Sequence, residues 1–387
     1  MVTTKRYILI AVIALIGGAI YFINSTGVKR TGSNDAVSVT PRMSIDTNGT
    51  ENAIPSKYLS AKVKSGRYEL AKEITTPDGF INTEDKPITL GSLVGKKVIL
   101  LDFWTYSCIN CQRTTPYLNA WYEKYKDKGF VIVGIHTPEF EFEKEYDNVK
   151  MAVEKLGIKF PVVLDNDYST WTAYKNRYWP RKYLIDIDGY VVFDHIGEGG
   201  YEETEQKIQE ALSERMAVLG ESGAIEGSLT KEVLVQNNAR SPETYFGAQR
   251  NTFFGNGSAG VSGNQNDLTL PEKLERNTLY LSGDWNITEE FAENNSIDAK
   301  IVYSYIGKDV FLVAKADTES SIEVLRDGKP LGADAGTDII KTPDGKTVVK
   351  IQEARLYKII KGDQSESGIL EFRTHKSRLK AFAFTFG

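Results

Sequence analysis

Cysteine and histidine are both scarce in this chain, which has two cysteines and three histidines in 387 residues. Two cysteines are too few for a fold held together by several disulfides. A structural zinc site needs four ligands, and His136, His195 and His375 stand far apart, so no metal is expected. The formal net charge of -5 indicates no basic surface for a nucleic acid. Composition therefore suggests neither a cofactor nor a nucleic-acid partner.

Long apolar runs are also rare, and the one that reaches the length of a membrane span is residues 7–23. A spanning helix needs at least ~17 apolar residues. No Ala-x-Ala-like cleavage site follows the run, which favours an anchor over a cleaved signal peptide, and no cysteine near its end offers a lipid attachment site. This single apolar run predicts a single-pass membrane protein. Lys5 and Arg6 precede the run, so we predict that the N-terminus lies on the inner side of the membrane. Residues 1–6 are then cytoplasmic and the C-terminal bulk is extracytoplasmic.

The two cysteines, Cys108 and Cys111, form a Cys-x-x-Cys motif between an apolar run and a helical pattern. Residues 98–103 are typical of a buried parallel strand. The helix is expected to begin at Cys108, where free backbone N–H groups stabilise a thiolate and lower its pKa. Cys111 lies one turn further on and is placed to attack a mixed disulfide formed on Cys108. The pattern therefore predicts a redox-active disulfide site.

Other interpretations of the motif are weaker. A permanent structural disulfide across so short a loop contributes little stability. A peroxidase would not need the second cysteine. Half of a zinc site would lack its other ligands. Thiol–disulfide exchange is therefore the favoured interpretation.

The segment Asp-Phe-Trp-x-x-x-Cys-x-x-Cys, followed five residues later by a proline, resembles thioredoxin. The narrower Tyr-Ser-Cys-Ile-Asn-Cys resembles the thioredoxin-like part of DipZ-type and TlpA/ResA-like bacterial envelope proteins. This resemblance implies that Cys108 is the nucleophile and Cys111 the resolving thiol. It also makes Asp102 the buried acid and Pro116 the proline that kinks the helix.

Two carboxylates are candidates for proton transfer. Asp102 should be buried in its strand with a raised pKa and serve as a proton acceptor for Cys111, although a local hydrogen bond would also explain a buried acid. Glu139 follows the strand expected at residues 130–136, at the sheet edge where sites gather, and the resemblance also points to it. The alternative for Glu139 is an acid that stabilises a helix N-terminus. His136 is expected to be structural.

Substrate contacts are expected from three residues. The resemblance implies a cis proline at Pro180, facing the cysteines, with Trp179 beside it shaping the substrate contact; an ordinary trans proline is the alternative. Tyr106, which lies just before the motif, is the third expected contact.

The remaining pattern predicts a thioredoxin-like α/β domain over residues 66–219, with the order β-α-β-α-β-β-α and helices on both faces of a sheet. Residues 68–96 resemble the β-hairpin that TlpA-like domains add before this core. After residues 98–103, strands are expected at residues 130–136, 160–164, 182–186 and 190–194, and helices at residues 110–128, 146–156, 169–176 and 202–218.

Residues 24–65 form a predicted flexible tether, and residues 220–239 a linker. Residues 240–387 contain many short alternating runs, which predict a jelly-roll-type β-sandwich, and they resemble the carbohydrate-binding-module-like end of DipZ-type proteins. The separate runs lie at residues 298–305, 309–316, 321–326, 347–351, 355–360 and 369–374. Three aromatic residues could line a sugar site, but the simpler interpretation is that they pack in the hydrophobic core: Trp285, Tyr303 and Tyr305. Phe382, Phe384 and Phe386 alternate as one core face does.

Together these features predict a membrane-anchored extracytoplasmic thiol–disulfide oxidoreductase that reduces disulfides of exported proteins, the direction being that of its TlpA/ResA-like relatives. A separate membrane electron donor of the CcdA/DsbD type is the expected partner. The alternative is a cell-envelope module that binds glycan or protein, with the thioredoxin-like domain as a scaffold. The intact motif, with Asp102 and Pro180 in place, favours the enzyme.

Overall fold

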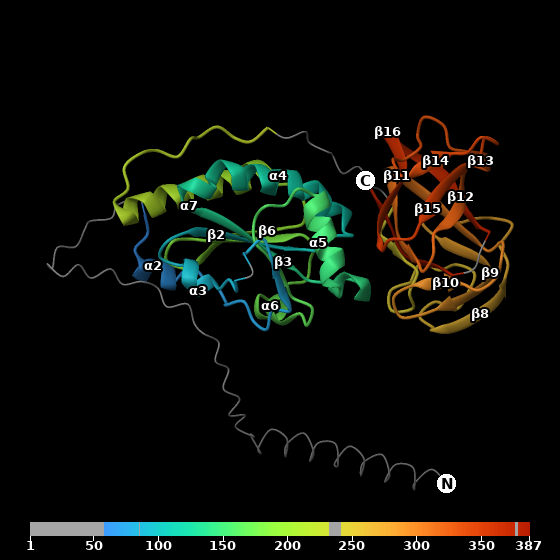
Figure 1. Ribbon diagram of the computed structural model, residues 1–387, viewed down its shortest axis with the longest axis horizontal. Helices are drawn as coiled ribbons and strands as arrows, with labels where there is room; N and C mark the ends of the chain where they lie inside the picture. The colour runs from blue at the N-terminus through green and yellow to red at the C-terminus, as the bar shows by residue number, and fades with distance from the viewer. Residues whose placement is uncertain (1–57, 85, 232–240, 376–377) are drawn as a thin grey trace, which may run out of the picture. The chain divides into compact units, whose positions relative to one another are not determined.

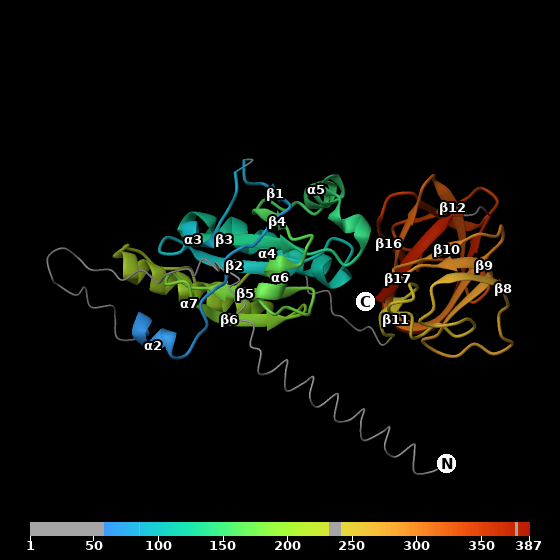
Figure 2. The ribbon, with the colours of Figure 1, turned by 90° about the horizontal axis from the view of Figure 1, so that it is seen from below.

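A buried sheet of six strands forms the centre of the first domain in the computed structural model (Figure 1). The structure describes residues 58–84, 86–231, 241–375 and 378–387. In sheet order, the strands are β1 (Gly79–Ile81), β4 (Val162–Leu164), β3 (Phe130–His136), β2 (Val98–Trp104), β5 (Arg181–Ile185) and β6 (Val191–Ile196). Figure 2 shows this order across the sheet. Strands β2, β3 and β4 are parallel, and β1, β5 and β6 each run antiparallel to a neighbour.

Helices cover both faces of this sheet, as predicted. One face carries α4 (Ile109–Tyr125), α5 (Tyr146–Lys155) and α7 (Tyr201–Leu219), and the other carries α3 (Leu90–Leu93) and α6 (Ser169–Ala173). Alternate residues of β2 serve the two faces, because successive side chains of a strand point to opposite sides. Leu100 packs under α4 and α7, whereas Leu101 and Phe103 pack toward α6. Burial on both faces explains the unbroken apolar run in the sequence.

The predicted helices and strands of this domain are confirmed, with ends shifted by a few residues. The strand at residues 130–136 has the predicted bounds. The predicted helix 110–128 is α4 followed by a short 3-10 helix, η1 (Lys126–Lys128). Gly129 ends it with a φ of 86°, a left-handed conformation that favours glycine.

The predicted N-terminal hairpin is wrong. Within the described part of residues 68–96, the two extended segments do not pair with each other. Instead β1 pairs with β4, and Leu70 bridges Tyr190 next to β6. The segment therefore extends the main sheet at β4 and reaches its opposite side at Tyr190. A short strand is present in this segment, but the residues with which it pairs lie far away in the sequence, and no local signal identifies them.

The second domain is all β, and 11 strands join in one hydrogen-bonded network of antiparallel pairs. The strands are β7 (Thr244–Tyr245), β8 (Gly263–Leu268), β9 (Leu279–Ile287), β10 (Ala292–Asn294), β11 (Lys300–Ala316), β12 (Ser320–Arg326), β13 (Lys329–Pro330), β14 (Ile339–Lys341), β15 (Thr347–Ile351), β16 (Arg355–Thr374) and β17 (Leu379–Phe386). Four predicted strands merge into two. The runs at residues 298–305 and 309–316 form the single strand β11, which begins two residues later than predicted. The runs at residues 355–360 and 369–374 form the single strand β16. The apparent break near Gly307 is a shift of register within a continuous strand.

The aromatic residues of this domain form its core. Trp285, Tyr303 and Tyr305 are each at most 1% exposed, so the structural interpretation of these three residues holds. Phe384 and Phe386 lie in the same core. Phe382 does not, because the register of β17 against β11 skips it. Both domains lie in one compact unit of the chain.

The skipped residue links the two domains. The ring of Phe382 packs edge to face on Phe140 and Phe142, which flank the start of η2 (Glu141–Lys144). Centroid distances of 5.2 and 4.8 Å are in the range of favourable aromatic pairs. All three alternating phenylalanines are therefore buried, as predicted. The prediction that they share one core face is wrong for Phe382, which packs against the first domain.

No helix in the described ranges is both long and apolar enough to span a membrane. The predicted anchor at residues 7–23 lies outside the described residues.

The helix α2 (Ala61–Ser65) is fixed to the first domain by a buried lysine. Lys64 Nζ lies 2.6 to 2.7 Å from carboxylate oxygens of Asp186, Asp188 and Glu214. In the described chain, these acids are the group spaced closely enough to share a cation, and the lysine ammonium already occupies the space between them. Burial opposes the charge on Lys64, but Asp186 and the hydrogen bonds raise its pKa overall. Three carboxylates around one ammonium make this an ion-pair network that depends on each member.

We predict that Lys64→Met lowers the free energy of unfolding by about 3 kcal/mol at neutral pH, because it leaves buried carboxylates without a cation. Because the folded pKa of Lys64 is raised, its stabilising effect is fully present at neutral pH and is lost only as the pH rises through that pKa. In the variant, the deficit should narrow as the pH falls and Asp186 and Glu214 take up protons. Urea unfolding across pH measures this. The exposed Lys62 on the same helix provides the control, and Lys62→Met should change stability by less than about 0.5 kcal/mol.

Candidate functional site

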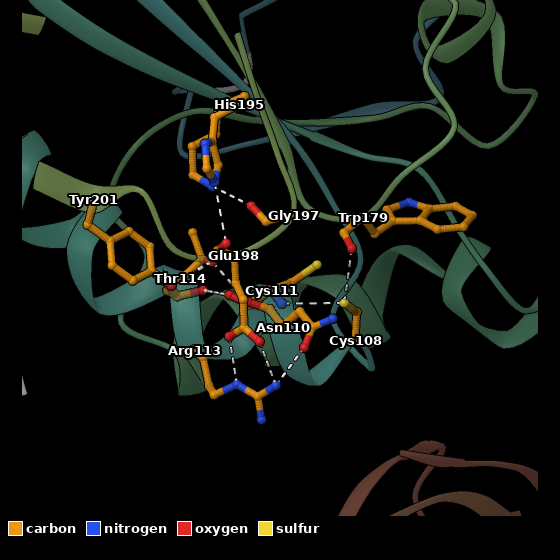
Figure 3. A network of polar contacts seen from close by, with 12 residues as sticks. Cys108, Asn110, Cys111, Arg113, Thr114, Trp179, His195, Gly197, Glu198 and Tyr201 are labelled. Carbon is orange, nitrogen blue, oxygen red and sulfur yellow. Dashed lines mark hydrogen bonds and ion pairs between the residues drawn. The ribbon is translucent and has the colours of Figure 1, made fainter. Parts of the chain in front are cut away.

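The two cysteines lie at the N-terminus of α4, directly after the carboxyl end of β2. Cys108 is the N-cap residue, and its Sγ accepts a hydrogen bond from the Cys111 N–H at 3.3 Å (Figure 3). Both cysteines are free thiols; Cys108 is partly exposed, and Cys111 is 2% exposed. Burial, followed by the contact with Cys108, raises the pKa of Cys111 well above its usual value. One thiol is therefore accessible at the helix start and the other is protected beneath it.

A buried glutamate braces the turn that precedes the helix. Glu143 Oε1 accepts a hydrogen bond from the Ser107 N–H at 3.1 Å, and its Oε2 accepts from the N–H groups of Glu139 and Phe140 at 2.6 and 3.0 Å. Burial is the main cause that raises its pKa to about 6, and the nearby Glu139 adds to the effect. Glu143 was not predicted from the sequence, because nothing in a glutamate-rich segment distinguishes the one acid whose side chain is buried.

Asp102 is buried on the face of β2 that lies under α4, as predicted. Asp102 is 2% exposed, and burial raises its pKa to about 7, against the opposing effect of Lys182. Lys182 Nζ lies 4.0 Å from Asp102 Oδ1. Lys182 was not predicted as a site residue from the sequence. Its only signal is a charged residue inside an otherwise apolar strand.

The Trp179–Pro180 peptide bond is cis, as the resemblance implied. The backbone oxygen of Trp179 lies 4.0 Å from Cys108 Sγ, which places this loop against the exposed thiol (Figure 3). Trp179 is partly exposed, and its indole N–H donates a hydrogen bond to the Thr137 oxygen at 3.0 Å. Three residues were expected to contact substrate. Pro180 and Tyr106 are buried, whereas Trp179 is partly exposed and its backbone oxygen is close to Cys108.

Tyr106 and His136 form a stacked pair beside the motif. Tyr106 is 5% exposed, and its hydroxyl donates to the Ala354 oxygen at 3.1 Å. Its ring stacks on His136 with a centroid distance of 5.7 Å. Burial lowers the pKa of His136 to about 3, so this histidine is neutral at physiological pH. The structure therefore gives Tyr106 a packing position, and His136 is structural as expected.

Glu139 is held by the second domain. Its Oε1 accepts hydrogen bonds from the Tyr245 hydroxyl at 2.8 Å and from Arg250 at 2.6 Å. The guanidinium of Arg250 also lies 3.7 Å from the centre of the Tyr245 ring. The proton-relay role predicted for Glu139 remains a prediction, and its carboxylate already has two donors.

A second polar network fixes the other side of the motif. Arg113 donates to both carboxylate oxygens of Glu198 at 2.8 and 2.9 Å, and to Asn110 Oδ1 at 2.6 Å (Figure 3). Such a bidentate pair defines geometry as well as energy. Thr114 Oγ1 lies 3.3 Å from the Tyr201 hydroxyl at the start of α7. The segment before α7, which the sequence analysis treated as structural, is therefore clamped onto α4 within one turn of the cysteines.

Comparison with known proteins matches both domains to known families. Residues 69–212 match the Redoxin family, and residues 241–387 match a family described as a thioredoxin-like C-terminal domain. Protein DipZ of Mycobacterium tuberculosis is 38% identical over 352 residues, which cover 89% of this chain and 47% of DipZ. The chain thus spans about half the length of the DipZ proteins it matches.

Shorter proteins match the first domain. The thiol–disulfide oxidoreductase ResA of Bacillus cereus is 38% identical over 126 residues, which cover 33% of this chain and 69% of ResA. Among solved structures, the thioredoxin domain of a thiol–disulfide oxidoreductase from Bacteroides vulgatus is 28% identical, covers 36% of this chain and 96% of that chain, and has a TM-score of 0.31.

The unequal burial of the two thiols predicts unequal alkylation. In the reduced full chain at about pH 6, iodoacetamide should modify Cys108 at least about tenfold faster than Cys111, because burial limits access to Cys111 and raises its pKa. Peptide mass spectrometry over time measures both rates. Cys108→Ser should leave the folded chain almost unreactive, and urea should restore labelling of Cys111. Equal rates in the folded parent chain would contradict the assignment.

Proposed function

This chain belongs to the thioredoxin-like thiol–disulfide oxidoreductases, and we propose that it is a membrane-anchored extracytoplasmic enzyme that reduces disulfides of exported proteins. The observation that carries the proposal is the pairing of an accessible thiol at a helix N-terminus with a buried thiol one turn further on. An accessible thiol at a helix start is suited to attack, and a buried neighbour is suited to resolve the product.

In the proposed reaction, the Cys108 thiolate attacks one sulfur of the substrate disulfide, and the other substrate sulfur leaves as a thiolate and takes up a proton. Cys111 then gives its proton to Asp102 and attacks Cys108 Sγ. This second attack forms the Cys108–Cys111 disulfide and releases the second substrate thiol. The substrate gains two electrons and the enzyme loses two. Asp102 is suited to the proton transfer because burial brings its pKa close to neutral.

The geometry around Cys108 supports the use of a polypeptide substrate. The backbone of the cis loop at Trp179 and Pro180 lies against the partly exposed thiol, and Trp179 itself is partly exposed, with its ring packed on Trp171. We propose Trp179 as the principal substrate contact. Tyr106, being buried, acts by holding the turn rather than by touching substrate.

Residues 7–23 would anchor the enzyme and residues 24–65 would give it reach above the membrane. A membrane electron donor of the CcdA/DsbD type would return Cys108 and Cys111 to the thiol form. The second domain would be a carbohydrate-binding-module-like jelly roll that docks the enzyme on an envelope glycan or protein. Trp285, Tyr303 and Tyr305 cannot serve as a sugar platform in this fold because they are buried, so any such ligand must use other residues.

The activity is tested by reduction of insulin with dithiothreitol as the electron source. The full chain should accelerate the reduction, and Cys108→Ser should abolish the acceleration. A parallel pull-down on cell-wall polysaccharide tests the alternative of a binding module. Strong retention on polysaccharide together with no insulin reduction would favour the binding module and overturn the enzyme proposal.

The location is tested with two reporter enzymes fused to the C-terminus, one active only outside the cytoplasm and one active only inside it. In a bacterial host, the proposed single span with Lys5 and Arg6 on the inner side should activate the outside reporter. Replacing residues 7–23 by a polar linker of equal length should reverse the result. Activity of the inside reporter on the unchanged chain would show that the orientation is wrong.

A further inference from the structure

We infer that Glu143 is a positioning residue of the redox site, whose carboxylate holds the turn that presents Cys108 and ties this turn to a segment that the second domain contacts. This inference rests on the proposed function, because it concerns the thiol that attacks the substrate disulfide. It gives the second domain a part in setting the reactivity of that thiol, in addition to the docking role proposed for it.

Three peptide N–H groups converge on the carboxylate of Glu143, which is completely buried. The Ser107 N–H donates to Oε1 at 3.1 Å, and the N–H groups of Glu139 and Phe140 donate to Oε2 at 2.6 and 3.0 Å. Ser107 directly precedes Cys108, the N-cap residue of α4. A single side chain therefore connects the start of the motif helix to the segment that follows β3.

Helix capping alone would explain only part of this arrangement. Glu143 is the third residue of η2, and a glutamate at this position commonly accepts a hydrogen bond from the N–H of the residue before the helix, here Phe140. That local role does not require the bond to Ser107, which lies 36 residues earlier in the chain. It does not require complete burial either, which is costly for a carboxylate. The bond to Ser107 is what links η2 to the motif turn.

The arrangement requires a carboxylate rather than another polar group. Both oxygens of an ionised carboxylate only accept hydrogen bonds, so Glu143 can serve donors on two sides at once. An amide of the same size has one accepting atom and one donating atom, and it would direct an N–H group at peptide N–H groups. A buried donor without an acceptor is costly. We therefore expect the turn before Cys108 to relax when an amide replaces the carboxylate.

The second domain fixes the other end of this link. Glu139 donates its N–H to the buried carboxylate, and its own carboxylate accepts from Arg250 at 2.6 Å and from the Tyr245 hydroxyl at 2.8 Å. The ring of the next residue, Phe140, packs on Phe382 with a centroid distance of 5.2 Å. Both donors to Oε2 therefore belong to residues whose side chains contact the second domain. A displacement of these side chains would reach the attacking thiol through one carboxylate.

The position of the turn matters for the reactivity of Cys108. Its Sγ accepts a hydrogen bond from the Cys111 N–H at 3.3 Å at the start of α4. A helix N-terminus stabilises a thiolate, because its N–H groups are free and its dipole favours negative charge. If the turn relaxes, the sulfur loses part of this stabilisation. A smaller fraction of Cys108 is then present as the reactive thiolate at a given pH.

The ionisation of Glu143 gives this effect a pH dependence. Burial raises the pKa of Glu143 to about 6, so its carboxylate is ionised at neutral pH and takes up a proton as the pH falls through that value. The proton occupies an oxygen that faces N–H donors, so the link is intact above about pH 6 and weakens below it.

Several other ionisable groups lie around this carboxylate: Glu139, Arg250, Tyr106, Tyr168, His136 and Glu243. The tyrosines and the histidine stay neutral from pH 5 to 8, because burial raises the tyrosine pKa values and lowers that of the histidine. Burial raises the pKa values of Glu243 and Asp102 to about 7. Both acids are present in the parent and in variants at position 143, so the difference between the two profiles isolates Glu143.

The test is alkylation of Cys108 by iodoacetamide from pH 5 to 8 in the reduced full chain, followed by peptide mass spectrometry. Glu143→Gln keeps the size and removes the ionised acceptor. Alkylation at pH 7 should be about tenfold slower than in the parent, which corresponds to a shift of the profile by about one pH unit. The two rates should converge below pH 6, where the parent also loses the link. Glu141→Gln makes the same change at an exposed residue of η2 and should match the parent.

A second variant, Glu143→Asp, separates geometry from charge. It keeps the negative charge, but its side chain is one methylene shorter and cannot reach both sets of donors. A positioning role predicts slow alkylation in this variant too, which also provides a second route if the glutamine variant folds poorly. Thermal unfolding identifies variants that have lost the fold.

A purely electrostatic role of Glu143 predicts the opposite pattern. Glu143→Asp would then react at the parent rate, and Glu143→Gln would react faster, because removal of a nearby negative charge favours the thiolate. That pattern would overturn the inference. Parent rates at every pH in both folded variants would overturn it as well.

The link to the second domain is tested with Arg250→Met, which releases the carboxylate of Glu139. Alkylation of Cys108 at pH 7 should slow by about threefold, and adding Glu143→Gln should slow it no further than Glu143→Gln alone, because both changes act through one connection. Arg276→Met removes an exposed cation of the same domain and should leave the rate unchanged. A parent rate in Arg250→Met, or fully additive effects, would show that the second domain takes no part.

Alkylation needs no substrate, so the outcomes separate this inference from the function on which it rests. If the parent chain reduces no insulin, the proposed function fails, whatever the alkylation profiles are. If the parent reduces insulin and both variants of Glu143 are alkylated as the parent is, this inference alone is overturned.

Discussion

The junction between β2 and α4 determines most of what this protein can do. The strand is buried on both faces, so the chain that leaves its carboxyl end must turn at once, and the helix that follows begins at Cys108. A spacing of three residues on a helix then puts Cys111 close to Cys108 but on the inner side. One covalent pattern therefore yields two thiols with opposite environments. The difference in burial alone is enough to make the two thiols differ in reactivity.

The sequence was sufficient for the features that depend on local order. The apolar run of β2, the glycine that ends the α4 segment at Gly129 and the proline at Pro180 each have a local signature, and the structure contains all three. It was insufficient for features that depend on strand pairing. Lys182 becomes meaningful only when β5 lies beside β2 in the observed register. Glu143 becomes meaningful only when η2 folds back onto the turn before Cys108.

The errors in the second domain have the same origin. The gap between the runs at residues 298–305 and 309–316 predicted two strands, but the long strand β11 absorbs Gly307 as a register shift, because its pairing with β16 continues on both sides of the gap. The same kind of irregularity turns Phe382 out of its alternating series and toward Phe140. Neither event changes the local hydrophobic pattern, so the pattern alone cannot distinguish two short strands from one long strand.

The two buried lysines show how one type of residue serves two purposes. Lys64 is surrounded by acids at hydrogen-bond distance, so its charge is fully neutralised and its environment is rigid. Lys182 lies 4.0 Å from Asp102, the group that most opposes the effect of burial on the pKa of this lysine, and this distance is longer than any of the three Lys64 pairs. A tight pair would keep Asp102 ionised, whereas no cation at all would make its charged state more costly in a buried site. An ammonium at an intermediate distance offsets only part of the cost of burial, which is why the pKa of Asp102 stays near neutral.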